Sequence, residues 1–296
     1  PDEHETWLRP VALVAADDPA TAVPDGRYHN SSYLRLAGGW QAFCLVDVVM
    51  RSAKDQQVPF TVWRTDYSSY RAASADKARA DSVLHELTTP RADIAGLKMD
   101  RPHLMGIVNV TPDSFSDGGV HLDSRKALGG ARQMLADGAS LVDIGGESTR
   151  PGAERVSAAE EQSRVLPVIK KLAQTGVPIS IDTMRAETAA LAIEAGASIV
   201  NDVSGGLADD LMHESVAEMG CPYILMHWRS HSKDMNSLAS YGDVVKEVIA
   251  EMQLQIDLAL KAGIARNNLI IDPGLGFSKE AEHNWEILKR IDEFTD

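Results

Sequence analysis

The chain has 296 residues, with 44% hydrophobic and 5% aromatic content, so it can form one large α/β barrel or two ordinary domains. Its formal net charge of −14 and pI of about 5.1 argue against duplex nucleic acid or an anionic membrane surface as a partner. The two cysteines, Cys44 and Cys221, suit a reducing cytoplasm rather than a disulfide framework. No apolar run reaches the roughly 18 residues of a membrane helix.

Residues 1–96 differ in composition from the rest and are predicted to form a small α+β accessory segment whose role the sequence does not reveal. No catalytic or metal-ligand spacing occurs in this segment. The expected elements here and just beyond are strands within residues 33–50, 59–63 and 97–101, and a helix over residues 74–87 with Ser74 as its N-cap.

Residues 97–296 are predicted to form a second domain, in which apolar strands alternate with amphipathic helices. This alternation predicts right-handed βαβ crossovers and a parallel sheet. The expected strands cover residues 104–110, 141–145, 179–182, 199–202, 223–226 and 269–272. The expected helices cover residues 125–137, 158–174, 185–194, 211–219, 244–262 and 283–294. Glycines that permit a left-handed cap follow the first five helices, at positions 138, 176, 196, 220 and 263.

A polar residue stands at or just past the end of each expected strand, and this decides between two architectures. In a TIM (β/α)₈ barrel such ends converge on one pocket, whereas in an open doubly wound sheet they spread along an edge. No Gly-x-Gly-x-x-Gly fingerprint follows any strand, so the barrel is favoured. The sequence contains six strand–helix pairs, and a closed barrel needs eight. We therefore expect a C-terminally incomplete barrel from a longer protein. The polar residues are Asn109, Asp143, Asp182, Asn201, His227 and Asp272.

The first of these strands opens into a dense polar loop. Residues 109–119 read Asn-Val-Thr-Pro-Asp-Ser-Phe-Ser-Asp-Gly-Gly. The loop carries two carboxylates, Asp113 and Asp117, three hydroxyls and one ring, Phe115. A loop of this kind after a buried strand is where α/β proteins place their functional groups.

The second strand ends in Asp-Ile-Gly-Gly-Glu-Ser-Thr-Arg-Pro-Gly, residues 143–152. The paired glycines allow close backbone approach, and Arg150 offers a planar fork for phosphate or carboxylate. Acids at later strand ends could bind Mg²⁺, act as acid or base, or accept hydrogen bonds from a donor-rich flat heterocycle. For Asp143 and Asp202, holding the backbone of a loop is an equally good interpretation.

In chain order, these two motifs are followed by Ile-Asp-Thr, Asn-Asp-Val-Ser-Gly-Gly, Leu-Met-His and Ile-Asp-Pro-Gly-Leu-Gly-Phe. Together they resemble the dihydropteroate synthase family of the folate pathway over residues 97–296. The resemblance implies that (7,8-dihydropterin-6-yl)methyl diphosphate and 4-aminobenzoate condense to 7,8-dihydropteroate and diphosphate. It also implies a homodimeric transferase that sulfonamides target, and the two cysteines place it in the cytoplasm. The Ser-Arg-Lys loop and Arg-x-His site of the family's last two strands do not occur in this sequence.

For the pterin, the resemblance implies that Asp182, Asn201 and Asp272 hold the ring and that Met226 packs on it. Asn109 would help to position Mg²⁺, the implied cofactor.

For the other groups, the resemblance implies that Thr149 and Arg150 face the diphosphate. Asp113 or Asp117 would stabilise the cation that forms when diphosphate leaves. The apolar walls of the 4-aminobenzoate site would be Phe115, Pro151 and Phe277.

Two other functions remain open from the sequence. One is a pterin-binding domain that transfers a methyl group from a folate to a corrinoid, and the other is a pterin-binding module without catalysis. The long first loop favours the synthase, because it has no obvious use outside condensing the pterin with a second substrate.

Overall fold

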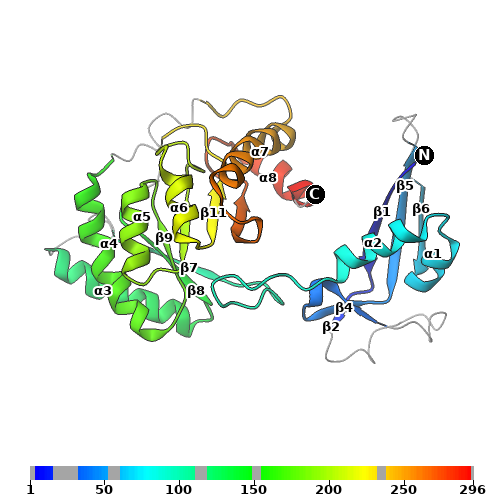
Figure 1. Cartoon of the computed structure of the whole chain (residues 1–296), viewed down its shortest axis with the longest axis horizontal. Coiled ribbons are helices and arrows are strands. Elements are labelled where there is room, and N and C mark those ends of the chain that lie inside the picture. Colours follow the sequence, from blue (N-terminus) through cyan, green and yellow to red (C-terminus); the bar gives the residue numbers. More distant parts are fainter. Residues whose placement is uncertain are drawn as a thin grey trace. The chain divides into compact units, whose positions relative to one another are not determined.

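The computed structural model describes residues 4–15, 33–52, 61–110, 119–148, 155–231 and 238–294. The chain divides into two compact units. The first comprises Pro1–Asp93 with Lys98–Pro102, and the second comprises Ile94–Leu97 with His103–Asp296. Each unit has its own sheets, helices and hydrophobic core (Figure 1).

The first unit consists of two small antiparallel sheets and two helices. The larger sheet has the strand order β1-β5-β6 and the smaller one β2-β4-β3. The strands are β1 (His4–Val11), β2 (Val14–Ala15), β3 (Leu34–Arg35), β4 (Gln41–Phe43), β5 (Leu45–Ser52) and β6 (Thr61–Asp66). The helices are the 3₁₀ turn η2 (Leu36–Gly38), α1 (Tyr67–Ala73) and α2 (Lys77–Thr88). Phe43, Val46 and Val48 form its buried core, against which Leu84 and Leu87 of α2 pack.

The expected strands within residues 33–50 and 59–63 correspond to β3 to β6, but the predicted helix cap is wrong. The carboxylate of Asp76 accepts a hydrogen bond from the backbone N–H of Arg79 at 2.9 Å, so Asp76 caps α2. Ser74 instead follows α1 as its C-cap residue. An aspartate two residues further on competes with Ser74 because either side chain can cap a helix.

The strand expected over residues 97–101 is also wrong. The chain turns at Ala95 and Gly96, whose φ angles are 48° and 79°. A single bridge between Ile94 and Leu97 closes this turn. Met99 and Asp100 form a further turn rather than a strand, and Lys98–Pro102 belongs to the first unit.

The second unit is built on a parallel sheet of six strands in sequential order, β12-β11-β10-β9-β8-β7. This is the order of consecutive strands in a TIM barrel. The strands are β7 (Met105–Asn109), β8 (Leu141–Gly145), β9 (Ile179–Asp182), β10 (Ile199–Asp202), β11 (Tyr223–Met226) and β12 (Leu269–Asp272). All six positions predicted from the apolar runs are confirmed.

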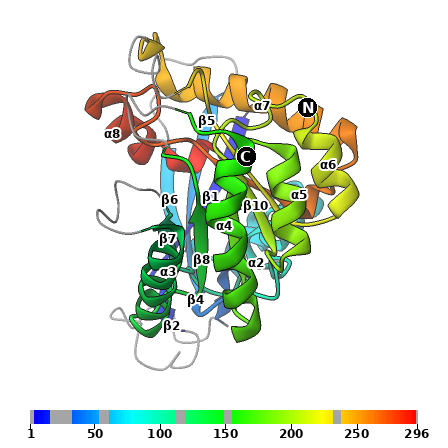
Figure 2. The ribbon, with the colours of Figure 1, turned by 90° about the vertical axis from the view of Figure 1, so that its left-hand side faces the viewer.

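Six helices follow these strands and cover one face of the sheet (Figure 2). They are α3 (Gly119–Ala136), α4 (Ala158–Leu172), α5 (Ala186–Glu194), α6 (Met212–Met219), α7 (Val244–Ala262) and α8 (Ala281–Lys289). The 3₁₀ turns are η4 (Ala173–Thr175), η6 (Arg266–Asn268) and η7 (Ile291–Phe294). The five glycines predicted to end helices all have positive φ angles, from 65° to 113°.

The core of the second unit lies between the sheet and its helices. It contains strand residues such as Val142, Ile144, Ile181, Val200 and Leu225, and helix residues such as Val165, Ile169, Ala189, Val216 and Val248. Because the strands are parallel, this packing brings their carboxyl ends to one edge of the sheet. Among the described helices, none is long and apolar enough to cross a membrane.

Candidate active site

Neighbouring strands end on polar residues that the sheet register brings to one level. Gly145 of β8 pairs with Asn109 of β7 and Asp182 of β9, and Asp182 pairs with Asn201 of β10. A β-carbon added to Gly145 would meet Oδ2 of Asp182 at 3.1 Å and Oδ1 of Asn109 at 3.4 Å. Two oxygen atoms thus converge above Gly145, and glycine leaves room for them.

Asn201 is held in place by Asp143. Nδ2 of Asn201 donates a 3.0 Å hydrogen bond to Oδ2 of Asp143, which is buried. Oδ1 of Asp143 has no hydrogen-bond partner among the described residues, and burial raises the pKa of this carboxyl. The bond uses one N–H of Asn201 and leaves its amide oxygen for a ligand. Asp143 therefore orients Asn201.

The carboxyl of Asp182 lies in a strongly acidic environment. Burial raises the pKa of Asp182 well above its usual range, and the carboxylates of Asp143, Glu161, Asp202 and Glu147 raise it further. Within the described part of the chain, no donor forms a hydrogen bond with Asp182. A partly buried acceptor without a donor among these residues is suited to a ligand that brings N–H groups.

Asp202, at the end of β10, is satisfied by the protein itself. Its oxygens accept hydrogen bonds from the backbone N–H and hydroxyl of Ser204 at 2.8 and 2.6 Å. They also accept from the backbone N–H of Gly206 at 2.7 Å and the hydroxyl of Tyr223 at 2.8 Å. Asp202 therefore holds the turn after β10. Of the two roles that the sequence left open for Asp202, the structure favours the one in which it holds the backbone of a loop.

The loop after β12 is held by Lys279, which is buried. Nζ of Lys279 lies 2.8 Å from Nδ1 of His227 and donates to the backbone oxygens of Gly274 and Phe277 at 3.1 and 3.0 Å. Asp272 accepts a hydrogen bond from the N–H of Gly274 at 2.8 Å. A β-carbon on Gly274 would lie 2.6 Å from the backbone oxygen of His227, so only glycine fits there. These contacts fix the loop that carries Asp272 and Phe277.

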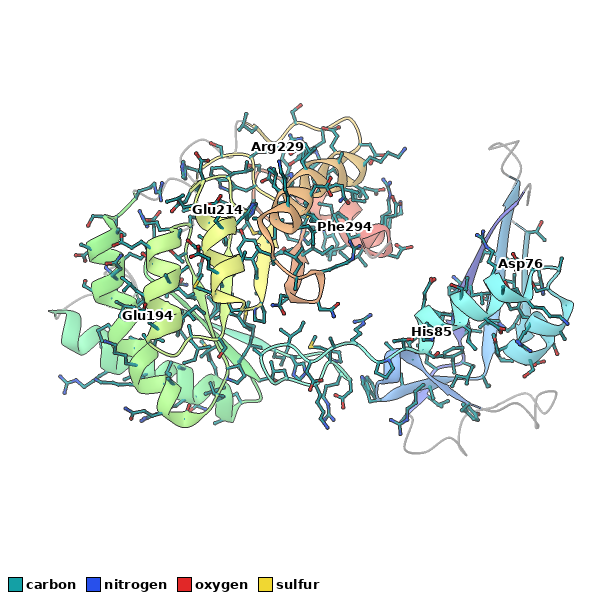
Figure 3. All side chains as sticks on the ribbon, viewed as in Figure 1. Asp76, His85, Glu194, Glu214, Arg229 and Phe294 are labelled. Carbon is teal, nitrogen blue, oxygen red and sulfur yellow. The ribbon has the colours of Figure 1, made fainter. Side chains whose placement is uncertain are left out.

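His227 connects Lys279 to α7. Burial lowers the pKa of His227 to about 4, and the charge of Lys279 contributes, so the imidazole is neutral at pH 7. Nε2 of His227 lies 2.9 Å from Glu251, which also accepts from Nε of Arg229 at 3.0 Å. Arg229 is labelled in Figure 3. These partners assign the proton to Nε2 and leave Nδ1 as an acceptor for Lys279. Burial lowers the pKa of Lys279 to about 7.

Arg185 braces the segment after β8. It donates to Glu161 at 2.6 Å and to the backbone oxygen of Val156 at 2.6 Å, and it lies 2.8 Å from Glu147. Glu147 also accepts from the N–H of Val156 at 3.3 Å. The described residues on both sides of positions 149–154 are thereby tied together.

Comparisons with known proteins agree with this arrangement. A sequence model of the family described as "Pterin binding enzyme" matches residues 105–296. The dihydropteroate synthase of Mycobacterium leprae is 50% identical over 191 residues, which are 64% of this chain and 67% of that protein. This chain belongs to the dihydropteroate synthase family.

Solved structures of dihydropteroate synthases from Xanthomonas albilineans have the same fold. One, with 4-aminobenzoic acid, has a TM-score of 0.64 and 45% identity over 69% of this chain and 74% of that chain. Another, in complex with 7,8-dihydropteroate, has a TM-score of 0.61 and 41% identity over 70% of this chain and 74% of that chain.

One relative of the family matches a longer part of the chain, which includes residues before position 97. A probable bifunctional folylpolyglutamate synthase/dihydropteroate synthase of Haloferax volcanii is 42% identical over 262 residues, 84% of this chain and 31% of that protein. Residues 97–296 number only 200 of the 296, so this match extends into the first 96 residues.

The structure brings half of the predicted dihydropteroate synthase residues to the carboxyl edge of the sheet. Met226 is buried with Met184 and Val203, and Phe277 packs against the same cluster. The residues at this edge are Asn109, Asp182, Asn201, Met226, Asp272 and Phe277. The other predicted residues, Asp113, Phe115, Asp117, Thr149, Arg150 and Pro151, lie outside the described residues.

Reasoning from the sequence missed Lys279. A lysine two residues after Phe277 carries no local signal, because an exposed lysine in a loop would look the same. Only the packing of this loop on β11, where His227 follows, makes the side chain buried.

Proposed function

We propose that this chain acts as a dihydropteroate synthase, a transferase of folate biosynthesis. It would condense (7,8-dihydropterin-6-yl)methyl diphosphate with 4-aminobenzoate and release 7,8-dihydropteroate and diphosphate. The observation that carries the proposal is the Asp182 carboxyl, which is crowded by other acids and accepts from no donor among the described residues. It lies beside an Asn201 amide that Asp143 holds.

The pterin ring fits the chemistry of this edge. A pterin has N–H groups along one side, and Asp182 would accept hydrogen bonds from them. Asn201 would offer its amide oxygen, and Asp272 its second carboxylate oxygen. Met226 would pack against the ring face, because a flexible thioether adapts to a flat apolar surface.

The 4-aminobenzoate site would lie next to Phe277, whose backbone oxygen is held by Lys279. Phe115, from the segment between β7 and α3, and Pro151, from the segment between β8 and α4, would complete its apolar wall. Sulfonamides, which imitate 4-aminobenzoate, should therefore compete with it in steady-state kinetics. Purely non-competitive inhibition would contradict this placement.

The reaction breaks one bond and forms one. The bond between the methylene carbon and the diphosphate oxygen breaks, and its electron pair leaves with diphosphate. The dihydropterin delocalises the positive charge, which Asp113 or Asp117 would stabilise, while Thr149 and Arg150 would bind the diphosphate. The amine of 4-aminobenzoate then forms the new C–N bond and loses a proton. Closure of the two loops would exclude water from the cation.

Mg²⁺ is the cofactor that we propose, with Asn109 as its protein ligand. Oδ1 of Asn109 is a hard oxygen donor near the Asp182 carboxylate. Mg²⁺ retains several waters and uses phosphate oxygens of the substrate, so a single protein oxygen fits its chemistry. Over the described ranges, no group of three His, Cys, Asp or Glu side chains could hold a metal ion. When bound, the ion would offset the charge on the departing diphosphate.

Diphosphate release by the purified chain, given both substrates and Mg²⁺, tests the function. We expect release that depends on 4-aminobenzoate. Calorimetry of dihydropterin binding on the same preparation separates an absent chemical step from an absent pterin site. Transfer of a methyl group from a folate to a corrinoid, without diphosphate release, would instead identify the methyltransferase function.

We further propose a cytoplasmic protein that forms a homodimer. Its cysteines Cys44 and Cys221 are both free and buried, which fits a reducing compartment. The likeness to the dihydropteroate synthases supports the dimer, and sedimentation equilibrium of the purified protein would test it.

A further inference from the structure

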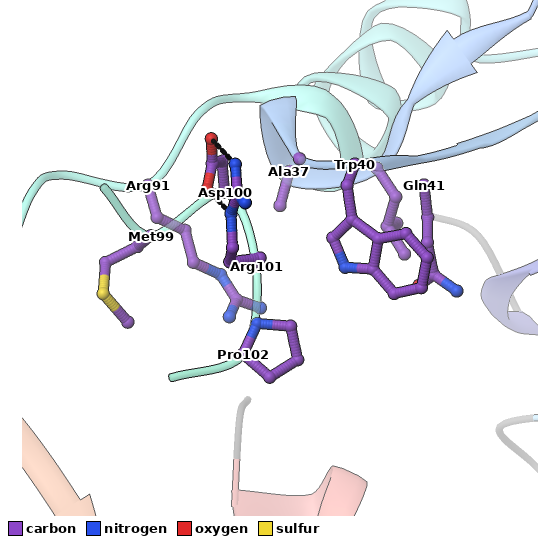
Figure 4. Close-up of a pocket in the computed structure, with 10 residues that line it drawn as sticks. Ala37, Trp40, Gln41, Arg91, Met99, Asp100, Arg101 and Pro102 are labelled. Carbon is purple, nitrogen blue, oxygen red and sulfur yellow. Dashed lines mark hydrogen bonds and ion pairs between the residues drawn. The ribbon is translucent and has the colours of Figure 1, made fainter. Parts of the chain in front are cut away.

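The first unit contains a pocket made of residues that the proposed reaction does not use. Its volume is about 390 Å³, within the range of small-molecule sites (Figure 4). Gln41, the first residue of β4, and Trp40, which precedes it, line one side of the pocket. The segment between α2 and β7 contributes Arg91, Met99 and Arg101. All of the lining residues belong to the first unit.

Several hydrogen-bond donors around this pocket have no partner among the residues that the structure describes. Arg91 forms no hydrogen bond or ion pair with any residue that the structure describes. The same holds, within those residues, for the indole N–H of Trp40 and the side-chain amide of Gln41. Trp40 is 48% exposed, which is unusual for so large an aromatic side chain. The pocket therefore offers a flat ring face and free N–H groups.

The pocket carries one net positive charge. Nε of Arg101 donates to Asp100 at 3.0 Å, and this ion pair offsets the charge of Arg101. Arg91 retains its charge, and Figure 4 shows its side chain extending past Met99 toward Pro102. The whole chain has a net charge of −14, so the field of the protein as a whole would not attract an anion to this pocket. A ligand attracted to this pocket would be a single anion that Arg91 recognises locally.

The walls of the pocket are fixed before any ligand binds. The N–H of Trp40 donates to the backbone oxygen of Asp100 at 2.9 Å. A β-carbon on Gly39 would lie 2.6 Å from that oxygen, and one on Gly38 would lie 2.8 Å from Pro90. These close approaches join β4 to the segment on the opposite side. A preformed pocket loses little conformational entropy on binding.

We propose that this pocket binds a small aromatic monocarboxylate, with its carboxylate on Arg91 and its ring on Trp40. The guanidinium fork of Arg91 matches the two oxygens of a carboxylate, and the indole face of Trp40 suits an offset-stacked ring. The single net charge selects a monocarboxylate over a phosphate, which would bring a second negative charge. The Gln41 amide adds a polar contact at the edge of the ring.

Calorimetry with 2-naphthoate on the whole chain at low salt tests the proposal, because this ligand has no amine to react. We expect one site in the first unit, weakened about tenfold or more by Arg91→Gln, since a hydrogen bond between charged groups is removed. Trp40→Leu should also weaken it, and cyclohexanecarboxylate, with the same charge but no aromatic ring, should bind less well. Arg79→Gln changes an exposed arginine outside the pocket and should have no effect.

Two controls separate this pocket from the pterin site. Arg91→Gln should release diphosphate at the wild-type rate, and Asp182→Asn should bind 2-naphthoate as the wild type does. Equal affinity in the wild type and Arg91→Gln, or absence of binding to the wild type at millimolar ligand, would overturn the proposal. Loss of 2-naphthoate binding in Asp182→Asn would place the ligand in the pterin site and overturn it as well.

Discussion

Nζ of Lys279 lies 2.8 Å from Nδ1 of His227, and this contact joins the loops that follow two adjacent strands, β11 and β12. Two backbone oxygens, those of Gly274 and Phe277, complete a set of three acceptors around the nitrogen. An ammonium group has three hydrogens for three acceptors, whereas a neutral amine has two. The conformation of this loop is therefore coupled to the charge of Lys279.

Lys279→Met should raise the KM for 4-aminobenzoate by about tenfold, roughly the 1.4 kcal/mol that one or two lost hydrogen bonds contribute. The reason is that Phe277 loses its anchor. The dissociation constant of the dihydropterin should change less, because Asp182 and Asn201 lie on other strands. Steady-state kinetics and calorimetry measure the two quantities. Lys289→Met, at an exposed lysine of α8, is the control, and an unchanged KM in Lys279→Met would contradict this role.

The stability of the protein should depend on pH through Lys279. The folded-state pKa is lowered to about 7 by burial, while an unfolded lysine keeps its usual value of 10.5. Between these values the unfolded chain binds more protons, so the free energy of unfolding should rise with pH, by up to about 1.4 kcal/mol per pH unit. Chemical denaturation at pH 7, 8.5 and 10 measures this rise. Lys279→Met should show a smaller rise, and identical pH profiles would contradict the assignment.

Asp182→Asn should weaken dihydropterin binding by about 1.5–3 kcal/mol, because a charged acceptor is replaced by a neutral amide. The pKa of Asp182 is raised in the folded protein, so wild-type affinity should also fall as pH decreases and the carboxyl gains a proton. The variant should lack that component of the pH dependence. Calorimetry over a pH series tests both statements, with the exposed Asp137→Asn as control. Unchanged affinity in Asp182→Asn would remove this residue from the site.

Gly145→Ala should reduce pterin affinity without unfolding the protein. The added methyl group would meet the ends of the Asp182 and Asn109 side chains at 3.1 and 3.4 Å, so these oxygens must shift. Gly129→Ala, in α3, meets no atom within 4 Å and is the matched control. It should raise stability by about 0.5–1 kcal/mol, as expected for alanine in a helix, and leave binding unchanged. Thermal unfolding and calorimetry compare the two, and equal pterin affinity would show that the oxygens above Gly145 do not contact the ligand.

The strand–helix pattern of the second unit could be predicted from sequence because its signals are local. Four-residue runs such as Tyr223–Met226 are apolar throughout, and glycines such as Gly263 mark helix ends. The resemblance to the family then predicted the pterin-binding residues, and two of them, Asp182 and Asn201, lie side by side in the sheet. In the first unit two possible N-cap residues lie close together, and the cap of α2 is Asp76 rather than the predicted Ser74.

The roles of the acids and of the buried lysine needed the folded chain. Asp143 and Asp202 look alike in sequence, but one orients Asn201 and the other is saturated by Ser204, Gly206 and Tyr223. Lys279 and His227 are 52 residues apart, and neither predicts the other. Burial, charge and hydrogen-bond partners arise from segments that meet only in three dimensions, so they could not be deduced from local pattern.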